Sequence, residues 1–461
     1  MGNSNSACVV FLGCPKNQVD SEHVLGSLTE AGYRLTTDQR AADLIVITTC
    51  AFLQSAVRES EAAVVEALKH KQGSPSKRVV VAGCLVERYG KSLKRKFPAV
   101  DLWVRLADMA RIGQLTAIRP SPFASRFSPL ASRLAPRVLS TPAHFAYLKI
   151  ADGCDHRCAY CTVPSLRGPY RSRPPADVLS EAQRLAAEGV QEIILIAQDT
   201  SGYGRDLAPP ASLPALLRGL GQLDWEGWLR VMYLHPARVN EELLAAMAEV
   251  PQVVPYVEMP LQHAAPGVLR RMGRAGGAEA YLALLGRIRE HLPEAAIRST
   301  FICGFPGETE AEFEELLAFV REARFDRVAL FPYWPEEGTP AASLPHQVPA
   351  ELAQERLEAV RELAESLSLE KNESLVGRRL RVLVERVEPP GAVGRSYRDA
   401  PEVDGEVLLA APLPGEAALT PGEFVEATIT AAQVHDLEGR PLPTPRTPRL
   451  AHIPPTGDPN P

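Results

Sequence analysis

Three cysteines, Cys154, Cys158 and Cys161, fall within the eight-residue segment CDHRCAYC. Thiolates are ligands that iron–sulfur clusters and zinc both accept. A structural zinc site needs four protein ligands, and the loop offers only His156 as a fourth, at an awkward position inside it. A cluster held by three cysteines leaves one iron open to a small molecule. The spacing therefore favours a reactive iron–sulfur centre that passes on an electron, with structural zinc as the alternative.

A second group of cysteines is spread through the N-terminal region, at Cys14, Cys50 and Cys84. Each follows an apolar run (VVFLG, LIVITT or VVVAG) that predicts a strand. The carboxyl ends of adjacent parallel strands meet at one edge of a sheet, so the three thiols can converge on a second cluster. The alternative is three independent buried cysteines. Cys8 and Cys303 lie inside predicted strands and are expected in the core.

The elements that position the second group occupy residues 7–118. Short apolar runs alternate there with amphipathic patterns, which predicts a three-layer α/β domain with parallel strands and crossover helices. Residues 119–139 are rich in Pro, Ser and Arg and are expected to form a linker. The predicted strands are Cys8–Leu12, Leu44–Thr48 and Val79–Ala82, and the predicted helices are Val19–Ala31, Gln54–His70 and Val86–Phe97.

The first cysteine group belongs to the next region, residues 140–371. Six apolar runs, most separated by helical patterns, predict a partial (β/α)6 barrel, in which the loops after the strands carry the chemistry. Polar and Gly-rich residues follow each run, and a long amphipathic stretch, Ala350–Lys371, leaves the barrel. The predicted strands are Phe145–Ala151, Val190–Ala197, Trp228–Leu234, Val253–Met259, Ala296–Cys303 and Arg327–Tyr333.

Residues 374–440 have a different character. Gly and Pro turns separate short alternating runs, which predicts a small antiparallel β-barrel. Its 11 acidic and 7 basic residues give a net charge of −4, whereas an RNA-binding barrel should carry a basic footprint. Residues 441–461 include eight prolines and are expected to be disordered.

Composition narrows the class of protein. The 461 residues, 45% of them hydrophobic, predict two to four globular domains. No apolar run approaches the roughly 20 residues that span a bilayer, and the N-terminus does not resemble an export signal. Clustered cysteines in such a chain more often bind metal than form disulfides. We therefore expect a cytoplasmic protein without membrane association, and a monomer by default.

The segment CDHRCAYC resembles the signature of the radical S-adenosylmethionine superfamily. The resemblance implies a [4Fe-4S] cluster whose open iron binds S-adenosylmethionine and whose electron cleaves it to a 5′-deoxyadenosyl radical. It implies cofactor contacts for Tyr160, which precedes the third cysteine, and for the motif FICGFPGE, which includes Gly304 and Glu308. Weaker candidates for cofactor contacts on the barrel rim are Gln198, Glu258 and Arg298.

The layout as a whole is similar to the methylthiotransferases, which combine an N-terminal domain with three cysteines, a radical S-adenosylmethionine barrel and a C-terminal TRAM domain. The resemblance covers residues 7–440. It implies a second [4Fe-4S] cluster on Cys14, Cys50 and Cys84, and two molecules of S-adenosylmethionine per turnover. One molecule supplies a methyl group to a sulfur on this auxiliary cluster, and the other supplies the radical.

Local motifs indicate the substrate. FLGCPKNQVDSE, AQDTSGYG and GRSYRDAPEVDG resemble the protein-modifying branch of the family, which acts on the β-carbon of an aspartate in protein twelve of the small ribosomal subunit. Gln18 and Ala51 depart from the usual residues beside two of the cysteines. The implied partners are this basic ribosomal protein, free or in the ribosome, and an electron donor such as flavodoxin or ferredoxin, with no requirement for direct RNA binding. A tRNA methylthiotransferase acting on an adenosine near the anticodon, and a non-catalytic iron–sulfur module, are the alternatives.

Overall fold

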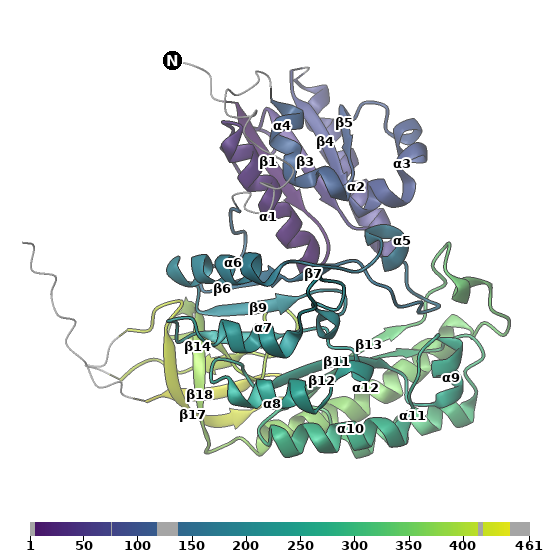
Figure 1. Cartoon of the computed structure of the whole chain (residues 1–461), viewed down its shortest axis with the longest axis vertical. Helices are drawn as coiled ribbons and strands as arrows, with labels where there is room; N and C mark the ends of the chain where they lie inside the picture. The colour runs from purple at the N-terminus through teal and green to yellow at the C-terminus, as the bar shows by residue number, and fades with distance from the viewer. Residues whose placement is uncertain (1–4, 75, 118–136, 414–417, 443–461) are drawn as a thin grey trace, which may run out of the picture.

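The N-terminal domain is built around one parallel sheet with the strand order β2-β1-β3-β4-β5 (Figure 1). The computed structural model describes residues 5–74, 76–117, 137–413 and 418–442. The expected linker therefore lies outside the described residues as far as residue 136, and the expected disordered tail from residue 443 onward. The elements are β1 (Ser6–Phe11), α1 (Pro15–Glu30), β2 (Arg34–Leu35), β3 (Leu44–Thr49), α2 (Gln54–Gln72), β4 (Arg78–Gly83), α3 (Cys84–Lys96), β5 (Leu102–Val104), η1 (Leu106–Arg111) and α4 (Ile112–Thr116).

Helices cover both faces of this sheet. Successive strand residues point to opposite faces. In β3, Ile45 and Ile47 therefore pack with α2 and α3, whereas Leu44 and Val46 pack with α1. Cys8 is buried in the first of these two cores. The predicted three-layer α/β architecture is confirmed.

Helix α1 begins four residues before the predicted start at Val19. Pro15 occupies its first turn, where proline is tolerated because its missing N–H would have no helical partner. The apolar pattern starts late because Lys16, Asn17 and Gln18 in this turn are polar, although all three are buried. Lys16 and Gln18 face the next domain, where Lys16 lies over the Tyr233 ring and Gln18 donates to Ser140 (3.1 Å). Asn17 instead donates to the carbonyls of Leu12 and Thr49 at the end of its own sheet.

The middle region forms a partial barrel of six parallel strands, as predicted. Two three-stranded sheets, ordered β10-β9-β6 and β11-β12-β13, are joined where Leu229 pairs with Val253. The strands are β6 (Phe145–Lys149), β9 (Glu192–Ile196), β10 (Trp228–Val231), β11 (Tyr256–Gln262), β12 (Ala296–Cys303) and β13 (Arg327–Pro332), with a small pair β7 (Ala151–Asp152) and β8 (Arg171–Ser172). The helical elements are α5 (Val163–Arg167), α6 (Pro175–Ala187), η4 (Thr200–Gly202), α7 (Leu213–Leu220), η5 (Pro236–Arg238), α8 (Glu241–Glu249), α9 (Pro266–Arg271), α10 (Ala278–His291), α11 (Glu310–Ala323), η6 (Pro340–Ser343) and α12 (Ala350–Glu373).

The C-terminal region is a closed barrel with the strand order β14-β15-β16-β18-β17. The sequence pattern predicts an antiparallel barrel, and the β16-β18 pair is parallel instead, because β18 returns beside β16 after β17 has crossed the barrel. The strands are β14 (Arg379–Glu388), β15 (Gly391–Ser396), β16 (Val407–Leu409), β17 (Phe424–Ala432) and β18 (Leu437–Pro441).

The segment between β15 and β16 inserts into the partial barrel. Ala400 is fully buried in a cluster with residues of β6, β9 and β11. The hydroxyl of Tyr147 in β6 donates to Glu402 (3.2 Å), and that of Tyr256 in β11 donates to Asp404 (2.7 Å). The C-terminal barrel therefore contributes both apolar and charged groups to the interior of the central one.

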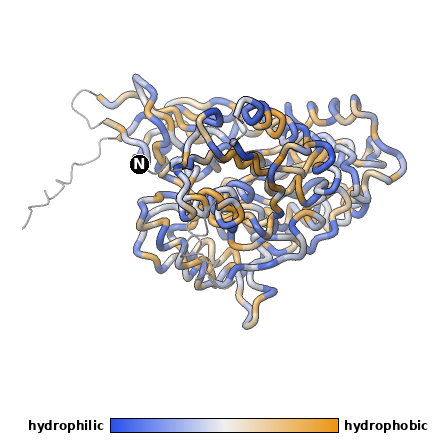
Figure 2. Tube along the Cα trace, turned by 90° about the horizontal axis from the view of Figure 1, so that it is seen from above, coloured by the Kyte–Doolittle hydropathy of each residue, from blue (hydrophilic) through white to orange (hydrophobic). Residues whose placement is uncertain are grey.

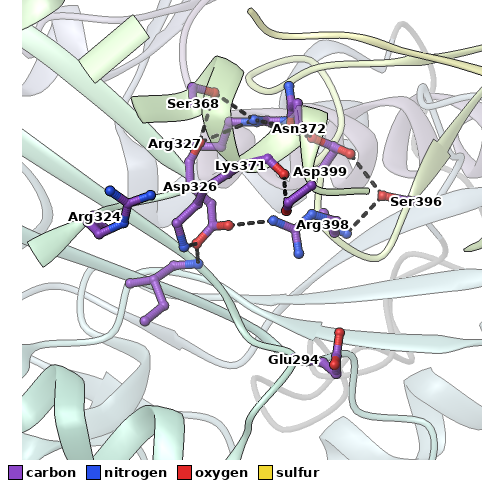
Figure 3. A network of polar contacts seen from close by, with 12 residues as sticks. Glu294, Arg324, Asp326, Arg327, Ser368, Lys371, Asn372, Ser396, Arg398 and Asp399 are labelled. Carbon is purple, nitrogen blue, oxygen red and sulfur yellow. Dashed lines mark hydrogen bonds and ion pairs between the residues drawn. The ribbon is translucent and has the colours of Figure 1, made fainter. Parts of the chain in front are cut away.

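A buried polar network holds the two barrels together (Figure 3). Asp326, which precedes β13, accepts hydrogen bonds from Arg398 of the inserted segment and from Lys371 of α12 (3.1 Å). Arg327 pairs with Asp399 of the same segment (2.7 Å). Buried ion pairs are expensive to break singly, so this network fixes the orientation of the C-terminal barrel.

Hydropathy follows this layered arrangement. Figure 2 shows hydrophobic stretches running through the interior and hydrophilic stretches along most of the outside. The central core joins the strands to α6, α7, α8, α10, α11 and α12, and Cys303 at the end of β12 is buried in it, as expected. Among the described residues, no helix is both long and apolar enough to cross a membrane.

Candidate active site

The first cysteine loop follows β7 and is closed by backbone hydrogen bonds. The Cys154 amide donates to the carbonyl of Gly168 (3.1 Å), and the amide of Ala159 donates to that of Met272 (2.9 Å). Gly153 has a φ of +78°, and an added Cβ would lie 2.1 Å from the carbonyl oxygen of Pro169. Only glycine fits this tight entry into the loop.

A cation lies beside the thiols of this loop. Burial raises the pKa of Cys161 to about 12 and also raises the pKa of Cys154, so both thiols stay protonated until a metal replaces the proton. Arg274 donates from Nη1 to Cys158 Sγ (3.8 Å), and its Nη2 is anchored on the carbonyl of Pro260 (2.9 Å). A fixed guanidinium stabilises the thiolates that cluster binding requires.

The second cysteine group lies at the carboxyl edge of the N-terminal sheet. Cys50 directly follows β3, Cys84 opens α3 directly after β4, and Cys14 caps α1 two residues past Leu12. A Cβ added to Gly13 would lie 2.9 Å from Cys50 Cβ and 3.3 Å from its Sγ, so the loop that carries Cys14 contacts Cys50 directly. Cys14 and Cys50 are also close enough to Cys84 for their charges to raise its pKa.

Burial and an arginine set the electrostatics of the second group. Burial raises the pKa of Cys84 to about 12, and the guanidinium of Arg167 opposes this rise. Arg167 Nη2 lies 4.0 Å from Cys84 Sγ. Since Arg167 belongs to α5, the helix that follows the first cysteine loop, one domain supplies the cation and the other the thiol.

The two cysteine loops are in contact. Thr162, next to Cys161, donates its hydroxyl to the carbonyl of Phe52, two residues after Cys50 (3.2 Å). Helix α3 also packs against α5 across the same boundary. In Figure 1, α5 lies between the N-terminal domain and the barrel. The structure therefore brings the loops of both groups to one site.

Tyr160 and the fifth-strand motif also meet. The Tyr160 ring lies edge-on to Phe305, with 6.4 Å between ring centroids, and burial raises its pKa well above the usual range. Gly304 has a φ of +76°, and Glu308 Oε2 accepts the amide hydrogens of Gly304 (3.0 Å) and Phe305 (3.2 Å). Arg356 of α12 pairs with Glu308 Oε1 (2.9 Å). Glu308 thus shapes this turn through its own carboxylate.

The three weaker rim candidates have different surroundings. Gln198 follows β9 near the rim. Glu258 and Arg298 are directly paired across β11 and β12, 3.5 Å apart, and Arg298 is bound on its other side by Asp404 (3.0 Å). Arg298 is therefore engaged by the inserted C-terminal segment, and its Nε is already satisfied.

Several polar atoms at this rim have no partner among the described residues. They are buried, and they lie just after β9 and β13: Gln198 Oε1, Thr200 Oγ1 and Tyr333 Oη. Buried polar groups are normally hydrogen-bonded. A polar ligand such as S-adenosylmethionine fits these atoms, and the two sets of thiols beside arginines fit anionic clusters. Within the described part of the chain, no three His, Cys, Asp or Glu side chains close around a single metal ion.

Three site residues are absent from the sequence predictions: Lys16, Arg167 and Arg274. Lys16 lies in the motif FLGCPKNQVDSE, two residues after a cysteine at a predicted strand end, and this position could have identified it as a site residue. Burial lowers the pKa of Lys16 to about 8. Arg167 ends α5 and Arg274 lies in the loop after α9, and their contact with the cysteines depends on the tertiary fold.

Comparisons with known proteins identify the family. Three family models match in order along the chain: "Uncharacterized protein family UPF0004" over residues 6–105, "Radical SAM superfamily" over residues 148–320 and "TRAM domain" over residues 376–442. The ribosomal protein uS12 methylthiotransferase RimO of Synechococcus sp. (strain RCC307) is 45% identical, and the match covers 93% of this chain and 88% of the relative. The chain belongs to the RimO family. The RimO of Symbiobacterium thermophilum is 43% identical, with 93% and 90% covered.

Membership in the RimO family confirms the expectation of a radical S-adenosylmethionine enzyme of the sulfur-group transferase class, and it leaves the non-catalytic alternative without support. The relatives' names do not favour the tRNA alternative. A solved structure, the radical S-adenosylmethionine methyltransferase TsrM from Kitasatospora setae with tryptophan substrate and an analogue of S-adenosylmethionine bound, superposes with a TM-score of 0.50 at 15% identity, covering 90% of this chain and 82% of that one. That likeness concerns the fold alone.

Proposed function

We propose that this chain replaces a hydrogen on the β-carbon of an aspartate in ribosomal protein uS12 with a methylthio group. The observation that carries the proposal is the match of 93% of the chain to RimO relatives named as uS12 methylthiotransferases. The contact between Thr162 and Phe52 supports it, because that contact joins the loops of the two cysteine groups. One substrate carbon can then face both groups, as a reaction that removes a hydrogen and adds sulfur requires.

The six cysteines are assigned in two sets of three. Cys154, Cys158 and Cys161 hold one [4Fe-4S] cluster, and the auxiliary cluster is held by the remaining three, Cys14, Cys50 and Cys84. When bound, the first cluster supplies the electron that cleaves S-adenosylmethionine, and the second carries the sulfur that receives a methyl group, so that each turnover consumes two molecules of S-adenosylmethionine.

The protein's own residues prepare this site. Arg274 stabilises the thiolate of Cys158, and Arg167 stabilises that of Cys84 from the opposite domain. The buried oxygens of Gln198 and Tyr333 bind polar groups of S-adenosylmethionine, and Tyr160, Gly304 and the turn held by Glu308 line its adenosine end. Glu258 and Arg298, paired across β11 and β12, are further candidates for contacts with it.

The partners follow from the same proposal. The substrate is the basic protein uS12, free or in the ribosome, and the C-terminal barrel is the domain that docks it. Of the surface groups there, Glu388, Glu406 and Glu438 lie on or beside its strands. The enzyme works as a cytoplasmic monomer, takes its electrons from a flavodoxin or ferredoxin and does not require direct RNA binding.

Purified components test the proposal. The reconstituted enzyme is incubated with uS12, S-adenosylmethionine and a chemical reductant, and both 5′-deoxyadenosine and the mass of uS12 are measured. We expect both products. 5′-Deoxyadenosine together with unmodified uS12 and a methylthiolated tRNA in a parallel incubation would replace the proposal with the tRNA activity.

A further inference from the structure

Lys16 places an ammonium group at the boundary between the N-terminal domain and the barrel. It lies in the first turn of α1, and its Nζ sits over the ring of Tyr233, 2.8 Å from the centroid. Tyr233 follows β10 with a φ of +64°, a conformation that non-glycine residues rarely adopt. Lys16 is only 7% exposed. A lysine so buried is rare unless it has a partner.

Two other cations at this boundary already have carboxylate partners. Arg167 pairs with Asp20 (3.0 Å) and Asp152 (3.1 Å), and Lys149 pairs with the same two residues. Lys16 differs from them. Within the described residues its Nζ makes no hydrogen bond and no ion pair, and the Tyr233 ring is its one cation–π contact.

Neighbouring Glu258 does not supply the missing partner. Its carboxylate accepts the amide hydrogen of Tyr233 and lies 3.5 Å from Arg298. The charge of Glu258 acts on Lys16, but among the described residues the two side chains form neither an ion pair nor a hydrogen bond. Among the described residues, no protein carboxylate would have to be displaced for an anion to pair with the Lys16 ammonium.

Lys16 also lies close to the loops that carry the two cysteine groups. Its charged neighbours include Cys14, two residues away, and Asp152, which precedes Cys154 by two residues. Cys14 belongs to one group and Cys154 to the other. A ligand held by this ammonium would therefore lie near the loops that carry the two groups.

We propose that the Lys16 ammonium binds the side-chain carboxylate of the substrate aspartate. This inference rests on the proposed function. The β-carbon of aspartate is bonded directly to its carboxylate carbon, so a cation that holds the carboxylate fixes the reacting carbon one bond away. Charge-assisted hydrogen bonds are shorter and stronger than neutral ones, and they gain further when water is excluded. Lys16 is accordingly a substrate-binding residue that selects an acidic side chain.

A double-mutant cycle on binding tests the inference. The affinity of the reconstituted holoenzyme for purified uS12 is measured for wild-type enzyme and Lys16→Met, each with native uS12 and with uS12 in which the target aspartate is changed to asparagine. Lys16→Met should weaken binding of native uS12 by roughly 10- to 100-fold, as expected for the loss of a hydrogen bond between charged groups. It should weaken binding of the asparagine form by less than about 3-fold, because the charge pair is already absent there.

Controls separate this outcome from a general defect. Lys91→Met removes an exposed lysine of α3 in the same domain and should leave all four affinities unchanged. The iron content of each variant is measured, which detects loss of a cluster. The comparison of native and asparagine uS12 uses wild-type enzyme, so a folding defect of an enzyme variant cannot affect it. Equal binding of native and asparagine uS12 by the wild-type enzyme, or equal weakening of both by Lys16→Met, would overturn the inference. Failure of the wild-type enzyme to methylthiolate uS12 would instead overturn the proposed function.

Discussion

The guanidinium of Arg167 lies 4.0 Å from the sulfur of Cys84, although the two residues belong to different domains. Arg167 is also held by Asp20 of α1 and by Asp152 beside the first cysteine loop. This arginine therefore connects the second cysteine group, the helix that follows Cys14 and the entry to the first group. Its position makes the electrostatics of each group dependent on the packing of both domains.

Replacing Arg167 by methionine should selectively weaken the auxiliary cluster. The change leaves buried thiolates without their cation, which disfavours deprotonation of Cys84. We expect the iron content of the reconstituted protein to fall toward that of one cluster per chain, measured by iron and sulfide analysis. Arg171→Met, at an exposed position a few residues along, is the matched control and should retain both clusters. Full iron content in the Arg167 variant would contradict this role.

Cys50→Ala should separate the two half-reactions. The variant keeps the first cysteine group, so 5′-deoxyadenosine should still form, whereas methylthio transfer to uS12 should stop. Cys8→Ala is the matched control. It removes a cysteine that is buried in the hydrophobic core of the same domain, and it should preserve both products. Chromatography of 5′-deoxyadenosine and mass spectrometry of uS12 check the two outcomes. Methylthiolated uS12 from the Cys50 variant would remove the auxiliary role.

Cys158→Ala should abolish formation of 5′-deoxyadenosine. Cys158 is the thiol that Arg274 contacts, and its loss leaves the first group with two ligands. The auxiliary group should still take up iron in this variant, so the protein should retain part of its cluster absorbance. Wild-type amounts of 5′-deoxyadenosine from this variant would show that the radical-forming centre lies elsewhere.

The network around Asp326 should contribute strongly to stability. Asp326→Asn removes the charge that faces Arg398 and Lys371, and breaking a buried ion pair by changing one partner costs about 3–5 kcal/mol. We expect a clear loss of unfolding free energy in denaturant titrations of the cluster-free protein. Glu370→Gln, which breaks an exposed pair with Arg324, should leave the unfolding free energy nearly unchanged, because exposed ion pairs contribute little. Equal effects of the two substitutions would contradict the assigned importance of the buried network.

Glu385 should make the junction of the two barrels sensitive to acid. Burial alone would raise its pKa, but the hydrogen bond with His144 and the charge of Arg395 outweigh burial and lower the pKa to about 2. Because the folded pKa is depressed, the stabilisation is present above the unfolded value near 4.3 and is lost as pH falls from there toward 2. The full difference corresponds to an order of magnitude of about 3 kcal/mol.

The Glu385→Gln variant tests this dependence. Its unfolding free energy should vary less between pH 4.5 and pH 2 than that of the wild-type cluster-free protein, where both forms are measured in the same buffers. Glu388→Gln, at an exposed position on the same strand, should keep the wild-type profile. An unchanged pH profile in the Glu385 variant would show that another group carries the acid sensitivity.

Much of the fold could be predicted from local pattern. Apolar runs gave the strands of both α/β regions, because parallel strands are buried on both faces and carry few polar residues. The start of α1 was predicted too late, because its first turn buries polar residues that contact another domain or the strand ends of their own sheet. The parallel pairing of β16 with β18 was also missed, because strand direction within a small barrel depends on how distant strands close it.

Some residues of the site could also be predicted from local pattern, and others could not. The cysteines could be found because a strand-end position and a short spacing are visible in one stretch of sequence. The contributions of Arg167, Arg274 and Asp404 could not, because each acts on a residue more than 80 positions away in the chain. Such contacts are determined by domain packing, which periodicity in a single sequence does not report.

Mass spectrometry of uS12 from cells with and without this gene tests the central claim most directly. The account predicts that uS12 from the parent strain carries the added mass of one methylthio group, located on an aspartate, and that uS12 from the deletion strain lacks it. Restoring the wild-type gene should restore the modification, and restoring the Cys158→Ala gene should not. Identical uS12 masses in the parent and deletion strains would contradict the account.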